Sequence, residues 1–209
     1  RRCLVGSEMC IRDSIKVAQA EGTDPPYSKA DIQECIKHVV DIGHGEKTDI
    51  APDIKISMEN AGHILGSSSV YMHIGEGSHE HRLLFSGDIK YEKSWLFDAA
   101  TVRFPKADTL VIESTYGGPQ DFQPNRVDAT HEIQDLVKLA VSRSGKIFCP
   151  VFAVGRSQEV MLAIDQLFKS GDVTPITVWL DGMISEATAI HASHPDSVSY
   201  THLTLPTNS

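Results

Sequence analysis

The chain has 209 residues, of which 41% are hydrophobic and 22% are charged; this is typical of a globular protein with one large domain or two small ones. Its formal net charge of -9 argues against a broad basic surface for nucleic acid, but it is compatible with a local groove lined by a few Arg and Lys side chains. No apolar run approaches the roughly 20 residues that a membrane span needs, and no signal peptide is evident. We therefore expect a cytoplasmic protein that does not associate with a membrane.

The cysteines favour a reducing compartment. They are Cys3, Cys10, Cys35 and Cys149, and no two of them form a C-x-x-C pair. Neither a disulfide framework nor a cysteine zinc site is therefore predicted. We expect Cys35 and Cys149 to be reduced thiols in the core.

The two ends do not continue the pattern of the body of the chain. Residues 1–13 and 197–209 resemble peptides that arise when sequencing-adapter DNA is translated at the ends of assembled reads. We expect both segments to be non-native and exclude them from the fold argument.

The first half is predicted to be rich in strands. A helix is expected within residues 25–40, with Ser28 as its N-cap, and a polar loop over 41–52. Alternating and β-branched patterns then predict strands in IKISMENA, SSSVYMHIG and RLLFSGD. The apolar start of ADTLVIESTYGG predicts a further strand that is buried on both faces.

The second half alternates helix and strand patterns. Asn125 can cap a helix that Gly145 ends, and residues 155–171 predict a second helix. The inward face of the first comprises Ala129, Ile133, Leu136, Val137, Ala140 and Val141. KIFCPVFAV and ITVWLDG are predicted as buried strands, and MISEATAIHASH as a helix. This alternation predicts a parallel sheet covered by helices, with a domain boundary near residue 120.

Three short motifs carry metal-type side chains in or beside small-residue turns: NAGHILGSS, FSGD and ESTYGG. His63 offers an imidazole nitrogen suited to zinc, and Asp88 offers two oxygens that could bridge two metals. Glu113 could bind metal or orient a histidine. Each residue alone has an ordinary alternative, since a lone His is usually structural, a Gly-Asp usually forms a turn and a Glu is usually solvated.

The order of the motifs is more specific than any one of them. GHILGSS, SGD, ESTYGG, PVFAVGRSQEVM and DGMISEATAIH follow one another, and together they resemble the archaeal β-CASP ribonucleases of the metallo-β-lactamase fold. These are relatives of the cleavage and polyadenylation specificity factor nuclease and, more distantly, of the RNase J enzymes. The resemblance covers about residues 15–195. It implies an α/β fold, with a partial metallo-β-lactamase αββα sandwich over 14–120 and part of a β-CASP domain with a parallel α/β sheet over 121–196.

The resemblance also implies roles for individual residues. His63 would bind one zinc ion, Asp88 would bridge two, and Glu113 would hold a catalytic histidine. Gly155 and Arg156 fall where a strand passes into a helix and could meet a phosphate of single-stranded RNA. The alternative for Arg156 is an ion pair with Glu159 or another carboxylate.

Two parts of the family pattern are missing. The H-x-H-x-D-H motif should lie before residue 14 and the later β-CASP histidines beyond residue 196. The other histidines do not replace them, because none has a partner at ligand spacing or in the expected context. We interpret these as surface, turn or helix-end residues: His38, His44, His73, His79, His81, His131, His191 and His194. The chain is therefore predicted to be an inactive fragment of a two-zinc enzyme.

The resemblance implies a parent that hydrolyses RNA phosphodiester bonds in mRNA 3′-end processing, transcription termination or RNA turnover. Such a parent would be an endonuclease, with 5′–3′ exonuclease activity left open, and would form a homodimer. Two alternatives also stay open: a non-catalytic paralogue that binds RNA or serves as a scaffold, and another hydrolase of the metallo-β-lactamase fold. A generic nucleotide-binding domain lacks the glycine-rich motifs that it would need.

Overall fold

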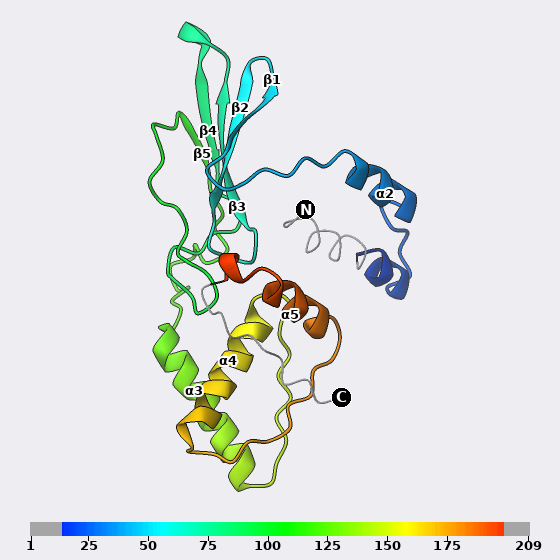
Figure 1. Ribbon diagram of the computed structural model, residues 1–209, viewed down its shortest axis with the longest axis vertical. Helices are drawn as coiled ribbons and strands as arrows, with labels where there is room; N and C mark the ends of the chain where they lie inside the picture. Colours follow the sequence, from blue (N-terminus) through cyan, green and yellow to red (C-terminus); the bar gives the residue numbers. More distant parts are fainter. Residues whose placement is uncertain (1–13, 199–209) are drawn as a thin grey trace. The chain divides into compact units, whose positions relative to one another are not determined.

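The computed structural model describes residues 14–198, so the adapter-like segment 1–13 and all but the first two residues of the segment 197–209 lie outside the described residues (Figure 1). The chain divides into two compact units. We call the first, which runs to Glu92 and includes Ala99–Ile112, the sheet unit. The second, which comprises Lys93–Asp98 and the residues from Glu113 onward, is the helical unit. Within the described part, no helix is long and apolar enough to cross a membrane.

The sheet unit contains a mixed five-stranded sheet in the order β1-β2-β3-β4-β5 (Figure 1). The strands have these bounds: β1 Lys47–Ala51, β2 Ile54–Asn60, β3 Ser68–Ile74, β4 His81–Phe85 and β5 Thr109–Val111. Strands β1 to β4 pair as antiparallel neighbours, and β5 pairs with β4 in parallel. The 3-10 turn η1, Gly77–His79, joins β3 to β4. The three strands predicted between residues 54 and 88 are thereby confirmed.

Two predictions for this unit are wrong. The expected polar loop contains β1, because a polar segment at the edge of a sheet can pair on one side and leave its other side to water. Strand β5 forms where a strand was expected, but all three of its residues are exposed. Strand β5 lies at the edge of the sheet opposite β1. Among the described residues it pairs only with β4, so its apolar side chains stay exposed.

Helix α2, Lys29–Lys37, begins as predicted. Ser28 accepts a hydrogen bond from the backbone of Asp31, and the Asp31 carboxylate accepts one in return from the Ser28 backbone. This capping box satisfies donors that the first helical turn leaves unpaired. Ile32 is the buried residue of the helix, whereas Cys35 is exposed. The prediction that Cys35 is a core thiol is wrong, since a short helix buries one narrow face.

The helical unit contains three α-helices and a closing 3-10 turn among its described residues. Their bounds are α3 Arg126–Ser142, α4 Arg156–Ser170, α5 Ile184–Ala192 and η2 Pro195–Ser197. Asn125 caps α3 as predicted. The left-handed residue after α3 is Ser144, with φ 49°, and the Gly145 N–H donates to the Ala140 carbonyl over 2.8 Å. Gly145 thus follows the left-handed position instead of occupying it.

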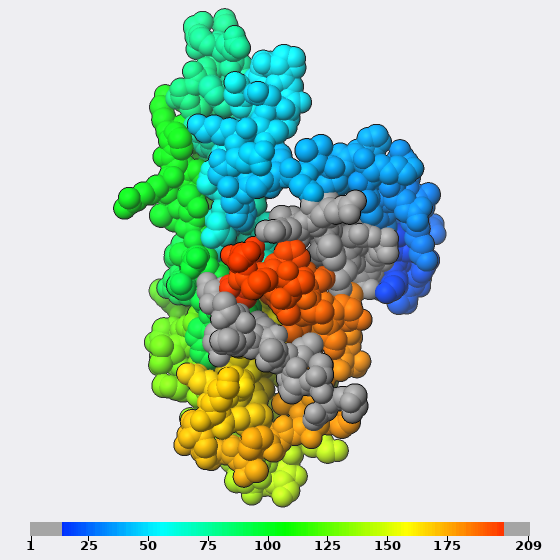
Figure 2. Space-filling model, viewed as in Figure 1, coloured from blue at the N-terminus to red at the C-terminus, as the bar shows by residue number. Residues whose placement is uncertain are grey.

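The core of the helical unit lies between α3 and α4. Val137, Leu167 and Val173 are buried there, and Val141, Ile164 and Phe168 pack against them. The predicted inward face of α3 is largely confirmed, but Ala129 and Leu136 are exposed and mark its limits. A buried polar contact links α4 to α5, because the Gln158 amide donates to the Thr188 hydroxyl over 2.9 Å. Figure 2 shows α5 and η2, in orange to red, at the visible surface of this unit.

The two strands predicted between these helices do not form. Residues 146–154 and 176–182 are extended or turn segments without strand pairing. Phe148 is 90% exposed, Trp179 is 89% exposed, and Cys149 is exposed instead of buried. An apolar run becomes a buried strand only where neighbouring strands supply hydrogen bonds and a second layer covers it. The structure thus shows an α/β protein with one mixed sheet, and the predicted parallel sheet is absent from the described residues.

Candidate metal centre

His63 lies in the tight loop between β2 and β3. The Ser67 hydroxyl accepts hydrogen bonds from the backbone N–H of His63 over 3.0 Å and of Ile64 over 3.1 Å. The Asn60 side-chain oxygen accepts another from the Gly62 N–H over 2.9 Å. Gly62 and Gly66 both have positive φ, a conformation that glycine adopts without steric cost. The loop is thus shaped by its own small and polar residues, and it presents the imidazole at the end of the sheet.

Asp88 follows β4 at the same end of the sheet. The Ser86 N–H donates to the Val111 carbonyl over 2.9 Å and extends the pairing of β4 with β5. Gly87 then turns the chain with φ 58°, and a Cβ atom there would lie 3.3 Å from the Ser68 carbonyl oxygen. A side chain at this position would be strained by its backbone conformation and crowded by β3. Glycine thereby lets the loop carry Asp88 close to the start of β3.

The structure brings His63 and Asp88 together. His63 Nε2 lies 3.9 Å from Asp88 Oδ2, and the two side chains are 41% and 72% exposed. Zinc binds imidazole nitrogen and carboxylate oxygen at about 2.0–2.2 Å each. Because 3.9 Å is less than the sum of two such bonds, one ion could contact both side chains. The pair is also open to solvent, so a substrate could reach it.

The pair fits zinc in donor type and separation but not in number. Zinc sites in proteins use three or four protein ligands. In the described residues, no group of three or more His, Cys, Asp or Glu side chains could hold a metal ion. His63 and Asp88 are therefore suited to be part of a metal site that needs further ligands.

Glu113 opens the helical unit, whereas His63 and Asp88 belong to the sheet unit. Its carboxylate accepts a hydrogen bond from the Thr115 hydroxyl over 2.5 Å. The side chain is half-buried in the turn that follows β5. Its role in orienting a catalytic histidine stays a prediction.

Gly155 and Arg156 lie at the start of α4, as predicted, but an extended segment and not the predicted strand precedes them. The Gly155 N–H donates to the Gln158 side-chain oxygen over 2.7 Å, and its φ is 80°. Arg156 pairs with Glu159 over 3.1 Å, and Arg126 binds the other oxygen of the same carboxylate. The alternative for Arg156, an ion pair with Glu159, is therefore confirmed. Arg126 and Arg156 carry two positive charges, and Glu159 balances one of them. That Arg156 binds an RNA phosphate stays a prediction.

His191 lies in the last turn of α5, as the helix-end interpretation has it, but it is buried and not at the surface. It is 2% exposed, its Nδ1 lies 2.7 Å from the Ala187 carbonyl oxygen, and its ring lies 5.8 Å from that of Phe97. Burial lowers the pKa of the imidazole because it disfavours the charged form. His194, at the end of the same helix, is half-buried. The i−4 hydrogen bond and the ring contact identify His191 as a core residue of the helical unit.

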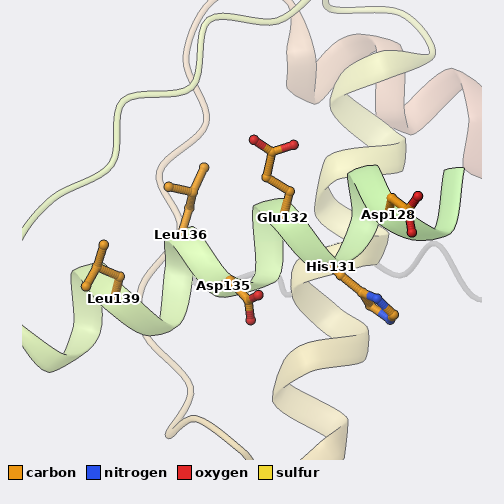
Figure 3. Close-up of a pocket in the computed structure, with 6 residues that line it drawn as sticks. All are labelled: Asp128, His131, Glu132, Asp135, Leu136 and Leu139. Carbon is orange, nitrogen blue, oxygen red and sulfur yellow. The ribbon is translucent and has the colours of Figure 1, made fainter. Parts of the chain in front are cut away.

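A shallow hollow on α3 gathers further acidic side chains but does not form a second centre. Its lining residues are Asp128, His131, Glu132, Asp135, Leu136 and Leu139. Figure 3 shows that all six project from one helix. Since no other element contributes a ligand, and no metal-holding group exists in the part of the chain that the structure describes, the hollow is an open helix face.

Comparison with known proteins gives a consistent set of relatives. The chain is 44% identical over 193 residues to a protein of Lokiarchaeum sp. and 47% identical over 184 residues to one of Methanosarcina mazei. It is 43% identical over 188 residues to one of Thermococcus kodakarensis. All three are named transcription termination factor FttA. Homologues of this chain are thus archaeal termination factors.

The matches cover 92%, 88% and 90% of this chain, respectively. The chain spans about 30% of the length of the relatives that it matches. No protein-family model matches it. The predicted similarity to archaeal proteins is confirmed, and the share of the relatives' length that the chain spans is consistent with the predicted fragment.

Proposed function

We propose that this chain is the part of a zinc-dependent, β-CASP-type ribonuclease that carries His63 and Asp88, and that the parent acts in archaeal transcription termination and RNA processing. The observation that carries the proposal is the pairing of these side chains at 3.9 Å at one end of the sheet. The name of the relatives, transcription termination factor, supplies the biological role. The order of the sequence motifs supplies the reaction class.

The residues of this chain would have distinct tasks in such an enzyme. His63 offers a neutral nitrogen, and Asp88 offers two oxygens that could bridge a pair of zinc ions. When bound, zinc supplies an activated hydroxide and stabilises charge on a phosphodiester. The glycine and serine loops hold the two side chains at the solvent-exposed end of the sheet, where an RNA backbone could approach them.

The helical unit would contribute to substrate handling. Glu113 would orient a catalytic histidine of the parent, and Arg156, with the α4 start at Gly155, would bind a phosphate of single-stranded RNA. Arg156 pairs with Glu159 at 3.1 Å, but Arg126 shares that carboxylate, so the two guanidinium groups keep one positive charge that a phosphate could balance. A cytoplasmic homodimer is the proposed state of the parent.

The alternative is a non-catalytic relative that binds RNA or a partner nuclease. His63, Asp88 and Glu113 are all present in this chain, which argues against it, whereas substitutions in the H-x-H-x-D-H motif of the parent would favour it. RNA cleavage by the parent protein decides between a ribonuclease and a non-catalytic relative.

The test is RNA cleavage by the full-length parent and by its Asp88→Asn variant. Asn keeps the size of the side chain but loses its charge, so we expect cleavage to fall at least 100-fold while RNA affinity changes less than threefold, as is typical when one catalytic group is lost. Asp49→Asn, at exposed strand β1, is the matched control and should cleave normally. Retained cleavage by Asp88→Asn would overturn the metal role, and an inactive wild-type parent would favour the non-catalytic relative.

A further inference from the structure

His44 lies in a structured turn that precedes β1. The Gly43 N–H donates to the Glu46 carboxylate over 3.0 Å, and the Gly45 N–H donates to the Met58 carbonyl over 2.8 Å. His44 itself forms an isolated bridge with Met58 on β2. The turn is therefore tied to itself and to the sheet, and it holds the His44 side chain in a defined place.

The His44 ring reaches the first residue of β3. Its Nε2 lies 2.9 Å from the Ser68 hydroxyl, which in turn lies 3.2 Å from the Gly66 carbonyl oxygen, to which it donates. Since the Ser68 proton is used in that second bond, Nε2–H of His44 is the donor in the first. The three groups thus form a chain of hydrogen bonds from the turn at His44 to the loop that presents His63.

Ser68 lies between the two loops of the candidate metal centre. It pairs with Asn60 across β2 and β3, directly where the His63 loop begins and ends. Its carbonyl oxygen is the atom that a Cβ on Gly87 would approach to 3.3 Å, one residue before Asp88. A shift of Ser68 would therefore move the loop of one candidate ligand and relax the packing against the loop of the other.

We propose that His44 is a positioning residue of the metal centre, which fixes the loops of His63 and Asp88 through Ser68. That the centre binds metal rests on the proposed function. The His44–Ser68–Gly66 chain of hydrogen bonds is observed independently of it. His63 and Asp88 are both substantially exposed, so packing alone does not hold their side chains. Metal affinity depends on groups behind the ligands that keep them oriented.

The first measurement is amide hydrogen exchange on the 209-residue chain. His44→Phe keeps a ring but removes the donor, and we expect the His63 and Ile64 amides to exchange about three- to tenfold faster, as the net loss of one hydrogen bond predicts. His44→Gln keeps an N–H donor and should restore slow exchange. His79→Phe changes a histidine in η1, at the opposite end of β3 and β4, and is the matched control. Unchanged exchange in His44→Phe would show that the His44–Ser68 hydrogen bond does not fix the His63 loop.

The second measurement is zinc affinity of the full-length parent by competition with a chelator. We expect His44→Phe and Ser68→Ala, which remove the same bond from its two sides, to lower zinc affinity about tenfold, in the range found for groups behind metal ligands. His44→Gln and His79→Phe should bind as the wild type does. Equal zinc affinity in all variants would overturn the positioning role, whereas a wild-type parent that binds no zinc would overturn the proposed function itself.

Discussion

The sheet unit and the helical unit differ in where their backbone hydrogen bonds come from. In the sheet unit, each strand from β1 to β4 pairs with the next along the chain, and short turns join them. In the helical unit, most backbone hydrogen bonds lie within α3, α4 and α5, and the apolar segments 146–154 and 176–182 form no strand pairs. Antiparallel neighbours and helices find their partners locally, whereas parallel strands need partners across a long connection. A stretch of sequence can thus fix a hairpin or a helix while leaving a parallel sheet unformed.

The largest expected effect tests where the helical unit has its core. Leu167→Ala should lower the free energy of unfolding by about 2–5 kcal/mol, because it opens a cavity between α3 and α4. Chemical denaturation of the chain, followed by circular dichroism, measures it. Phe152→Ala, in an exposed extended segment, is the control and should change stability by less than about 0.5 kcal/mol. A comparable loss in Phe152→Ala would show that the extended segments are packed.

A smaller effect concerns the pH dependence of the stability of the helical unit, which contains the buried His191. Burial lowers the pKa of His191 below its ordinary 6.5. Above that pH the imidazole is neutral in both the folded and the unfolded state, and below it the unfolded state takes up the proton first. Stability should therefore fall as pH drops below 6.5, by at most about 1.4 kcal/mol per pH unit for one proton.

His191→Gln should remove that part of the pH dependence, as measured by denaturation between pH 7.5 and pH 5. His38→Gln, which changes the exposed histidine that caps the end of α2, is the control and should keep it. An unaltered slope in His191→Gln would show that this imidazole is not held neutral by burial.

The smallest effect concerns the sheet unit and its leading helix. Ser28→Ala removes the hydroxyl that caps α2 and should cost about 1 kcal/mol of local stability. Faster exchange of the α2 amides would report the loss. Ser78→Ala, in η1, where the structure shows no side-chain cap, should leave exchange as it is. Equal behaviour of the two variants would mean that the capping box contributes nothing.

The sequence predicted elements whose signals are local. Ser28 and Asn125 were identified as caps from the residues that follow them, and both cap their helices. The exposure of KIFCPVFAV and of β5 could not be predicted, because burial depends on what lies over a segment and not on its own composition. The burial of His191 was missed for a related reason, since its partners, Phe97 and the Ala187 carbonyl, become neighbours only in the fold.

The candidate site was predicted in part. His63 and Asp88 were singled out as ligands of one centre, and the structure brings them together. The contribution of His44 was not predicted, because its partner Ser68 lies 24 residues away and a histidine that binds a hydroxyl has no sequence signature. Glu113, Gly155 and Arg156 stay predictions for roles that involve metal or RNA.

The most direct test of the central claim is the zinc content of the purified parent, compared with its His63→Ala and Asp88→Asn variants by elemental analysis. Exposed Asp98, which pairs with Lys93, provides the control variant Asp98→Asn. We expect the wild type and Asp98→Asn to hold about two zinc ions per chain and both site variants to hold fewer. Equal zinc content in all four proteins, or a wild type without zinc, would contradict the assignment of His63 and Asp88 to a metal centre.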